Sequence, residues 1–290
     1  MNVRPAVRAG SFYDGSPSAC KQHARNLLDS VQLPDDLPDR LYGGLVPHAG
    51  WVYSGRVAAM TFAALAAAGR LQTVVLLGAD HAGVVHQGEV YDTGAWETPL
   101  GKVPIDEPLA AALVGAAEWL RSNPRAHAME HSVEVQVPLL QTACPDCKIV
   151  PVAVPPTHLA VQIGRTIGQT LAQQAPGACV IGSTDLSHHA GHFPAPGGHG
   201  KQGEEWTARN DRRMIDLIEA MEAEKVVPEA NERHNACGAG AVAAAVAACT
   251  ALGATRGICL EYTNSYRVVH ALYPNDPDDT TVGYASIVFA

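Results

Sequence analysis

Short apolar runs alternate with longer helix-like stretches along almost the whole chain. The runs typical of strands are 42–46, 73–77, 149–154, 179–182, 258–262 and 282–289. The stretches typical of helices are 17–30, 55–68, 107–117, 132–142, 159–174, 204–222 and 238–251. Parallel strands need long crossover connections, which helices usually provide, so this alternation predicts an α/β fold with a largely parallel mixed sheet flanked by helices. No helix signal in 261–273 precedes the last run, which favours an antiparallel edge strand.

Composition fits one well-packed domain. Of the 290 residues, 47% are apolar and 17% are charged, so a large core is available and broad disorder is not expected. There is no internal repeat and no linker-like segment, and we therefore expect a single domain over 1–290. The net charge of −9 argues against a nucleic-acid surface and against docking on anionic membranes.

The beginning of the chain indicates where the protein works. MNVRPAVRAGSFY has no apolar core of the kind that a signal peptide needs, and no apolar run in the chain reaches membrane-spanning length. We therefore expect a cytoplasmic protein. Its seven cysteines are an odd number, which fits free thiols with one metal ligand among them better than a disulfide framework.

Two histidines stand at the ends of predicted strands. His48 closes the segment LYGGLVPHAG, and His81 closes TVVLLGADHAG. Ligands of open α/β sheets bind beyond the carboxyl ends of the strands, and imidazoles that converge there suit a divalent metal. A single histidine at a strand end is more often structural, but two in the same context favour a pair of metal ligands.

A third strand-end segment is rich in histidine. In CVIGSTDLSHHAGH, Asp185 is followed by His188, His189 and His192. An aspartate beside a histidine can fix its tautomer and raise its basicity, as general acid–base catalysis requires. The alternative is that residues 183–185 only cap a helical turn, which does not account for three histidines within five positions.

The cysteines fall into three kinds. Cys237 lies just before the small-residue stretch 238–251, and a thiol at a helix N-terminus is expected to have a lowered pKa and to bind metal as thiolate. The alternative is a buried structural cysteine, which better describes Cys249 and Cys259. Cys144 and Cys147 form a CPDC segment that matches half of a zinc site or a redox pair, but without a second pair it is more typical of a turn.

A further polar pair lies in MEHSVEVQVPLL. Glu134 follows His131 by one helical turn, so both side chains could face a metal or a substrate. Ser132 offers the alternative that this is only the start of a helix. The segment 191–203, GHFPAPGGHGKQG, is rich in glycine and proline and follows the histidine cluster, which leaves open a lid or a plain surface connection.

Six segments resemble successive signatures of the Memo family. They are RPAVRAGSFY, VPHAGWVYSG, WETPLGKVPID, EHSVEVQVPLLQ, DLSHH and VGYASIVF. No single segment is specific, but six in the same order from residue 4 to residue 289 are. The bacterial branch of this family is called protein B of the AmmeMemoRadiSam system, so the resemblance implies a radical-SAM partner protein.

The resemblance also implies a fold and a metal site. The family is similar in fold to the class III extradiol dioxygenases of the LigB type, which bind non-haem Fe(II). Its site, carried over to this chain, consists of the metal ligands His48, His81 and Cys237 with the catalytic pair Asp185 and His188. The implied cofactor is one metal ion: Fe(II) in the first place, copper next and zinc third.

The resemblance implies substrate contacts as well. Aromatic residues of the family pocket match Phe12 and Tyr53, and Trp51 stands where the family usually has tyrosine. Together with His131 and Glu134 they are our predicted substrate-binding residues, for a small molecule or a peptide. EYTNSYRV and the glycine-rich segment after His192 also depart from the family pattern.

Two functions remain open from the sequence. One is a metal-dependent oxidoreductase, in which Asp185 and His188 move a proton beside the metal. The other is a non-catalytic scaffold that binds a metal or a peptide in a dioxygenase-like pocket. The cysteine ligand separates this site from the carboxylate-containing dioxygenases, because a soft thiolate shifts preference toward copper or toward different iron chemistry.

Overall fold

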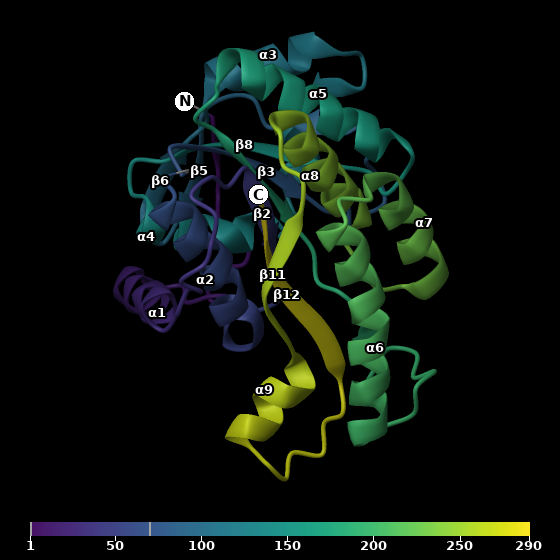
Figure 1. Ribbon diagram of the computed structural model, residues 1–290. Helices are drawn as coiled ribbons and strands as arrows, with labels where there is room; N and C mark the ends of the chain where they lie inside the picture. The colour runs from purple at the N-terminus through teal and green to yellow at the C-terminus, as the bar shows by residue number, and fades with distance from the viewer. Residues whose placement is uncertain (1, 70) are drawn as a thin grey trace.

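A large mixed sheet organises the molecule (Figure 1), seen in a computed structural model that describes residues 2–69 and 71–290. In spatial order its strands are β10 (His188–His189), β12 (Thr281–Phe289), β2 (Gly43–Val46), β9 (Cys179–Ser183), β3 (Thr73–Gly78), β8 (Lys148–Ala153), β4 (Gly88–Val90) and β7 (Leu120–Ser122), and β11 (Gly257–Asn264) pairs with β12. The four strands from β2 to β8 are parallel, while β12 and β4 run antiparallel to their neighbours β2 and β8. The predicted α/β class with a largely parallel mixed sheet is confirmed.

Helices cover both faces of this sheet. They are α1 (Pro17–Asp29), α2 (Trp51–Ala67), α3 (Glu107–Ala116), α4 (Val137–Ala143), α5 (Leu159–Gln174), α6 (Gly200–Glu219), α7 (Ala223–Arg233), α8 (Ala239–Leu252) and α9 (Ser265–Leu272), with the 3-10 turns η1 (Pro124–His127) and η2 (Glu134–Gln136). A side-chain carbon on Gly43 would meet Cys249 of α8 at 2.8 Å, and one on its neighbour Gly44 would meet Thr61 of α2 at 2.8 Å. Since successive strand residues point to opposite faces, α8 and α2 lie on opposite sides of β2.

The composition of α8 follows from its surroundings. Every residue from Ala239 to Cys249 is buried, because the helix lies between the sheet and α5. A side-chain carbon on Gly164 of α5 would stand only 2.2 Å from the carbonyl oxygen of Ala244, so the two helices approach to backbone contact. Small residues are required on both sides of such an interface.

Two expectations near the end of the chain are wrong. The segment before the last strand contains α9, whose first turn is capped by Asn264: its side-chain oxygen accepts a hydrogen bond from the Arg267 N–H at 2.9 Å. The strand β12 is antiparallel as predicted, but it is not an edge, because β11 pairs along its other side. Long-range pairing, which no local pattern reports, decides this.

Local boundaries also differ from expectation. The helix α6 begins at Gly200, so the irregular segment after the histidine cluster is shorter than 191–203. Further elements that we did not predict are α7, which contains Pro228, and a small sheet of β1 (Val3–Arg4), β5 (Ala95–Thr98) and β6 (Gly101–Pro104). Within the described ranges, no helix combines the length and the apolar character that a bilayer crossing requires.

Candidate metal centre

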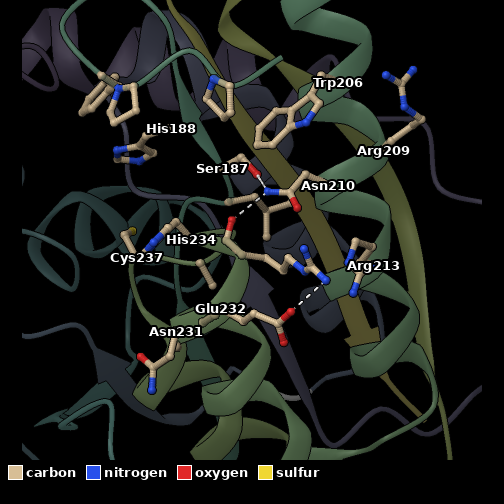
Figure 2. Close-up of a pocket in the computed structure, with 18 of the residues that line it drawn as sticks. Ser187, His188, Trp206, Arg209, Asn210, Arg213, Asn231, Glu232, His234 and Cys237 are labelled. Carbon is tan, nitrogen blue, oxygen red and sulfur yellow. Dashed lines mark hydrogen bonds and ion pairs between the residues drawn. The ribbon is translucent and has the colours of Figure 1, made fainter.

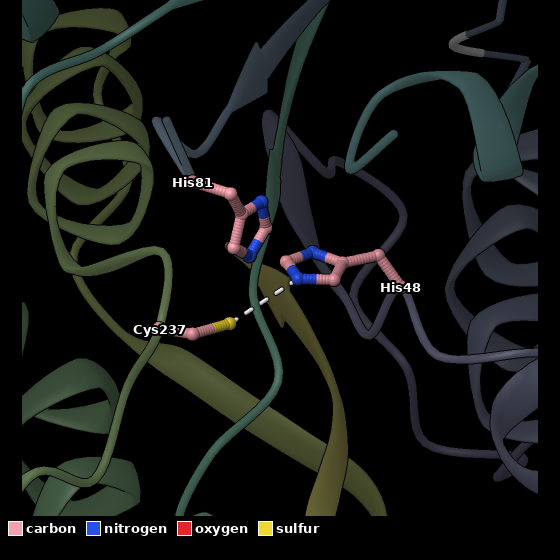
Figure 3. A group of neighbouring side chains, drawn as sticks. All are labelled: His48, His81 and Cys237. Carbon is pink, nitrogen blue, oxygen red and sulfur yellow. Dashed lines mark hydrogen bonds between the residues drawn. The ribbon is translucent and has the colours of Figure 1, made fainter. Parts of the chain in front are cut away.

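His48, His81 and Cys237 come together at the carboxyl end of the parallel strands (Figure 3). His48 follows β2 and His81 follows β3, the two strands that flank β9, while Cys237 precedes α8. One donor atom of each residue lies within 4.8 Å of the others, and Cys237 Sγ is 3.2 Å from His48 Nε2. The arrangement is a converging set of two imidazoles and one thiol.

The hydrogen bonds of His48 define its tautomer. The Ser183 hydroxyl donates to the carbonyl oxygen of Ser132 at 2.8 Å, so its oxygen is free to accept. His48 Nδ1 lies 3.0 Å from that oxygen and must carry the hydrogen of this bond. His48 Nε2 is therefore unprotonated and directed at the thiol. Burial, together with the neighbouring His81 and His131, holds the pKa of His48 well below its ordinary value.

His81 is oriented by a carboxylate. Its Nδ1 lies 2.9 Å from Glu130 Oε1, and its backbone N–H donates to Glu130 Oε2 at 3.0 Å. Burial alone would lower the pKa of His81, but the hydrogen bond and the charge of Glu130 outweigh it and raise that pKa. Burial likewise opposes ionisation of Glu130, but the same contact with His81 and backbone N–H groups hold its pKa well below the ordinary range.

Cys237 does not have the lowered pKa that the sequence predicts. The helix α8 begins at Ala239, two residues later, and burial followed by the negative charge of Asp185 raises the thiol pKa. The N–H of Asp185 donates to Sγ at 3.3 Å, which lowers the thiol pKa, but burial raises that pKa by more. The metal-free residue is a thiol, and metal binding must displace its proton.

Asp185 and His188 do not form the expected pair. Asp185 Oδ1 accepts the backbone N–H groups of His48 at 2.7 Å and Ala49 at 3.2 Å, and burial raises its pKa to about 7. In the described part of the chain, no hydrogen bond joins Asp185 to His188. The carboxylate fixes the backbone turn that carries His48, and it does not orient the ring of His188.

His188 opens onto a cavity of about 890 Å³, which Cys237 also lines (Figure 2). Its Nε2 is buried and has no hydrogen-bond partner among the described residues. Burial, followed by the charges of His81 and His192, lowers the pKa of His188 to about 4, so the ring is neutral at pH 7. His189 turns the other way, toward Trp206 and the Gly197 N–H.

The predicted substrate-binding residues separate into two groups. His131 stacks on His81 with ring centres 4.5 Å apart, and Phe12 packs edge-on against His131 at 5.0 Å. Burial and the charge of His81 lower the pKa of His131 to about 4. Tyr53 is exposed near the start of α2. Phe12, His131 and His81 therefore form one continuous aromatic wall beside the site.

Trp51 and Glu134 are engaged elsewhere. Trp51 is buried against Tyr13, and its indole N–H donates to the carbonyl oxygen of Val135 at 3.1 Å. The Glu134 carboxylate pairs with Arg4 at 2.8 Å and accepts hydrogen bonds from the Tyr13 hydroxyl and from two backbone N–H groups of residues 7–8. Both side chains tie the start of the chain to the core.

Sequence reasoning missed the residues that orient the ligands. Glu130 precedes the His131 that we had singled out, and its acidic character next to a histidine was the available signal. Ser183 was considered only as a helix cap, although it ends the strand between the two histidine-bearing strands. A polar residue at that position is placed to contact a neighbouring histidine, as Ser183 contacts His48.

The CPDC segment forms a turn between α4 and β8. Cys144 and Cys147 are free thiols, and the Cys147 N–H donates to the Cys144 carbonyl oxygen at 3.2 Å. A second candidate group of ligands does exist among the described residues, composed of His81, Glu130 and His131. It shares His81 with the first group and does not include the CPDC cysteines.

Comparison with known proteins bears on the family and the fold. The family model described as Memo-like protein matches residues 4–288. MEMO1 family proteins of Methanopyrus kandleri and Methanothermobacter thermautotrophicus are 36% and 34% identical, with alignments that cover 100% and 99% of this chain and 99% and 100% of theirs. The crystal structure of an uncharacterized protein from Escherichia coli K12 superposes with a TM-score of 0.54 at 13% identity, over 87% of this chain and 100% of that one, which shows a shared fold.

Proposed function

The chain belongs to the Memo-like family, and from that premise we propose that it is a metal-dependent oxidoreductase that holds one ion through His48, His81 and Cys237. The observation that carries this proposal is the convergence of three donor atoms within 4.8 Å, from segments far apart in the sequence. Such convergence is what a metal site requires.

The residues fit a metal ion in detail. The Nδ1 atom of His48 is engaged by Ser183 and that of His81 by Glu130, so each ring has its Nε2 free for a ligand bond. Outer partners of this kind are typical of metal-binding histidines, because they fix the tautomer and the orientation of the ring. The third donor, Cys237, supplies a soft ligand once it is deprotonated.

The donor set favours particular metals. Three protein ligands leave coordination positions open, as in catalytic sites, and a bound redox-active ion supplies electron transfer there. Imidazole and thiolate suit iron, copper and zinc. We propose Fe(II) first, copper next and zinc third, the last of which would support no redox step.

His188 is the proposed proton carrier. Its Nε2 is buried and unpartnered among the described residues, and the residue lines the cavity that Cys237 shares. With a pKa of about 4 it is neutral at pH 7 and able to accept a proton. Asp185 contributes indirectly, because it fixes the backbone of His48.

One observation favours a second function, a scaffold that binds a metal or a peptide without catalysis. The Asp185–His188 pair, which acid–base chemistry would use, is not formed. A site that keeps its ligands but lacks an oriented base is the arrangement expected after loss of catalysis. We propose this scaffold as the alternative.

Metal analysis of anaerobically purified protein tests the proposal, followed by O₂ consumption with an added reductant. Wild type and the control His158→Ala, which alters an exposed histidine, should retain the metal and consume O₂. His48→Ala should lose both. Stoichiometric metal without any O₂ consumption would favour the scaffold, and wild-type protein that takes up no metal under anaerobic loading would contradict the oxidoreductase and leave only a peptide-binding scaffold.

Partners follow as a proposal from the family resemblance. We propose a small-molecule or peptide substrate and a radical-SAM partner protein. Co-purification from cells that express both proteins tests the partner. Recovery of the radical-SAM protein with the wild type at high salt would support the association, and its absence at low salt would count against it.

A further inference from the structure

The segment that carries His188 is held by α6 and not by Asp185. Among the described residues, no hydrogen bond joins Asp185 to His188, and the Asp185 carboxylate accepts from the backbone of the His48 turn. The residue directly before His188 is Ser187, and two neighbouring side chains of α6, Asn210 and Asp211, hydrogen-bond to it. These contacts offer another way to orient His188.

Asp211 binds the backbone of Ser187. Its Oδ1 accepts the Ser187 N–H at 2.8 Å, and its Oδ2 accepts the hydroxyl of Tyr262 from β11 at 2.7 Å. The Asp211 side chain is fully buried, which raises its pKa to about 7, and the two donors are neutral. A buried carboxyl with neutral partners is costly by comparison with an apolar residue, so packing alone does not account for it.

The Asp211 carboxyl lies directly against β12. A side-chain carbon on Gly283 would stand 1.8 Å from Asp211 Oδ2, so any other residue at this position of the strand would displace the carboxyl. The Gly283 N–H in turn donates to the Ser187 carbonyl oxygen at 3.0 Å. Both backbone groups of Ser187 are therefore bound, the N–H by Asp211 and the carbonyl oxygen by β12.

The backbone at Ser187 determines where the next side chain points. His188 and His189 follow as β10, which pairs with β12. Side chains alternate along a strand, so the two histidines face opposite sides, and of the two His188 lines the cavity. The His188 ring packs there against Phe193 with ring centres 4.8 Å apart. A shift of the backbone at Ser187 would change this contact.

Asn210 connects the same segment to the stretch that leads into Cys237. Its side-chain amide donates to the Ser187 hydroxyl at 2.9 Å, a contact visible beside the cavity in Figure 2, and to the Arg233 carbonyl oxygen at 3.0 Å. The Asn235 amide donates back to the Asn210 carbonyl oxygen at 2.9 Å. Adjacent residues of α6 thus hold both segments of the chain that line this side of the site.

We propose that Asp211 is a positioning residue for His188, which it orients by fixing the backbone of Ser187, in place of the Asp185 contact that the sequence predicts. The inference rests on the proposed function for the role of His188 as proton carrier. It deepens that function, because it supplies the oriented base whose absence favours the scaffold.

NMR of the metal-free protein tests this role without any measurement of activity. In the wild type, cross-peaks should connect the His188 and Phe193 rings, and the pKa of His188 should lie at about 4. Asp211→Ala should lose the cross-peaks and raise the pKa of His188 toward the ordinary value of about 6.5, because a released ring regains water. Asp211→Asn should restore both properties, since the Ser187 N–H needs only an acceptor oxygen.

Tyr262→Phe is the matched control. It removes the hydroxyl that donates to Asp211 and should destabilise the fold, but it leaves the Ser187 contact, so the His188 signals should stay as in the wild type. If Asp211→Ala does not fold, Asp211→Leu combined with Tyr262→Phe removes both polar partners at nearly constant shape and should move the His188 signals in the same way. Chemical denaturation measures the stability of each variant.

Two results would overturn the inference. One is a folded Asp211→Ala protein, or the double variant, that keeps both the cross-peaks and the low pKa of His188. The other is a Tyr262→Phe protein whose His188 signals change as much as those of Asp211→Ala, because the carboxyl would then act through stability alone.

The inference and the proposed function fail separately. At equal metal content, Asp211→Ala should slow O₂ consumption by roughly 10–100-fold and Asp211→Asn should recover it, since small displacements of a catalytic group reach losses of this size. If the NMR signals move as expected but the wild type consumes no O₂, the oxidoreductase fails and the orientation of His188 by Asp211 stands. If Asp211→Ala consumes O₂ as fast as the wild type with unchanged NMR signals, the positioning role fails and the oxidoreductase stands.

Discussion

The two histidines of the candidate metal centre are held in opposite ways. His48 is 2% exposed and is oriented by the neutral hydroxyl of Ser183, whereas the side chain of His81 is 34% exposed and is oriented by the carboxylate of Glu130. Burial lowers the pKa of His48, and the carboxylate raises that of His81. A shared position at a strand end therefore does not give a shared electrostatic environment.

In the proposed metal site, the two histidines would contribute differently to metal binding. His48 is already neutral, so it is ready to bind and releases no proton. The pKa values of His81 and of the Cys237 thiol are raised, so each must lose any proton it carries at the ligand atom before it can bind the metal. Acid should therefore weaken metal binding through His81 and Cys237, while His48 contributes rigidity.

Removal of either histidine should have the largest effect. His48→Ala and His81→Ala should each lower metal affinity by more than about 100-fold, since each loses a ligand bond and outer-partner changes alone reach that range. His48→Ala should also destabilise the fold more, because its ring is buried. Competitive metal titration and chemical denaturation measure the two effects. Equal affinity of wild type and His81→Ala would show that His81 is not a ligand.

The orienting partners should have the next largest effect. Glu130→Gln should lower metal affinity by roughly 10–100-fold, because it removes the charge that supports His81. Ser183→Ala should lower metal affinity by about tenfold, because it leaves the Nδ1–H of His48 without an acceptor. The same titration measures both. If Ser183→Ala lowered metal affinity more than Glu130→Gln does, the proposed ranking of these two orienting partners would be reversed.

The pKa values themselves can be measured by NMR titration of the metal-free protein. His81 should titrate above the ordinary histidine pKa and His48 well below it. The charged His81 stabilises the fold below its ordinary pKa, and this contribution is lost as pH rises through the raised value. His48 acts in the opposite sense, because stability falls as pH drops below about 6.5, where only the unfolded chain takes up the proton.

A variant sharpens this titration. Glu130→Gln should bring the pKa of His81 down and leave that of His48 low, because burial is the largest cause of the His48 shift. If the pKa of His81 were unchanged in this variant, Glu130 would not be the cause of its raised value.

The smallest effect is expected from Asp185→Asn. The asparagine oxygen can still accept the two backbone N–H groups, and the carboxyl it replaces has a pKa of about 7, so at pH 7 only about half of a full negative charge is lost. Metal affinity should change by less than roughly tenfold, the lower bound for outer partners. Asp185→Ala is the matched control and should lower metal affinity more, because it removes the acceptor of the two backbone N–H groups.

Much of the fold was predictable because its signals are local. Apolar runs located β2, β3, β8, β9, β11 and β12, and their alternation with helices specified a parallel centre. The helix α9 was missed although Asn264 caps it, because a pattern of eight residues is too short to separate a helix from a strand. The strand β12 is not an edge strand because β11 pairs with it, and no pattern within either segment predicts that pairing.

The site was predictable in its position and not in its chemistry. His48 and His81 follow parallel strands, whose carboxyl ends lie at the same edge of the sheet. Their positions after these strands were therefore enough to predict that the two side chains lie close together. The structure decided that Trp51 and Glu134 face the N-terminal segment and that Asp185 holds a backbone turn. Which way a side chain turns depends on neighbours that are distant in sequence.

The sequence by itself indicated the family, through the resemblance of six ordered segments, the α/β class, through periodicity, and a set of candidate ligands, through residue identity. Only the tertiary structure decided the protonation of those ligands. Cys237 precedes a helix, which predicts a lowered pKa, but burial and Asp185 raise it. Desolvation depends on every atom that excludes water from a group, and no sequence neighbour of Cys237 reports that sum.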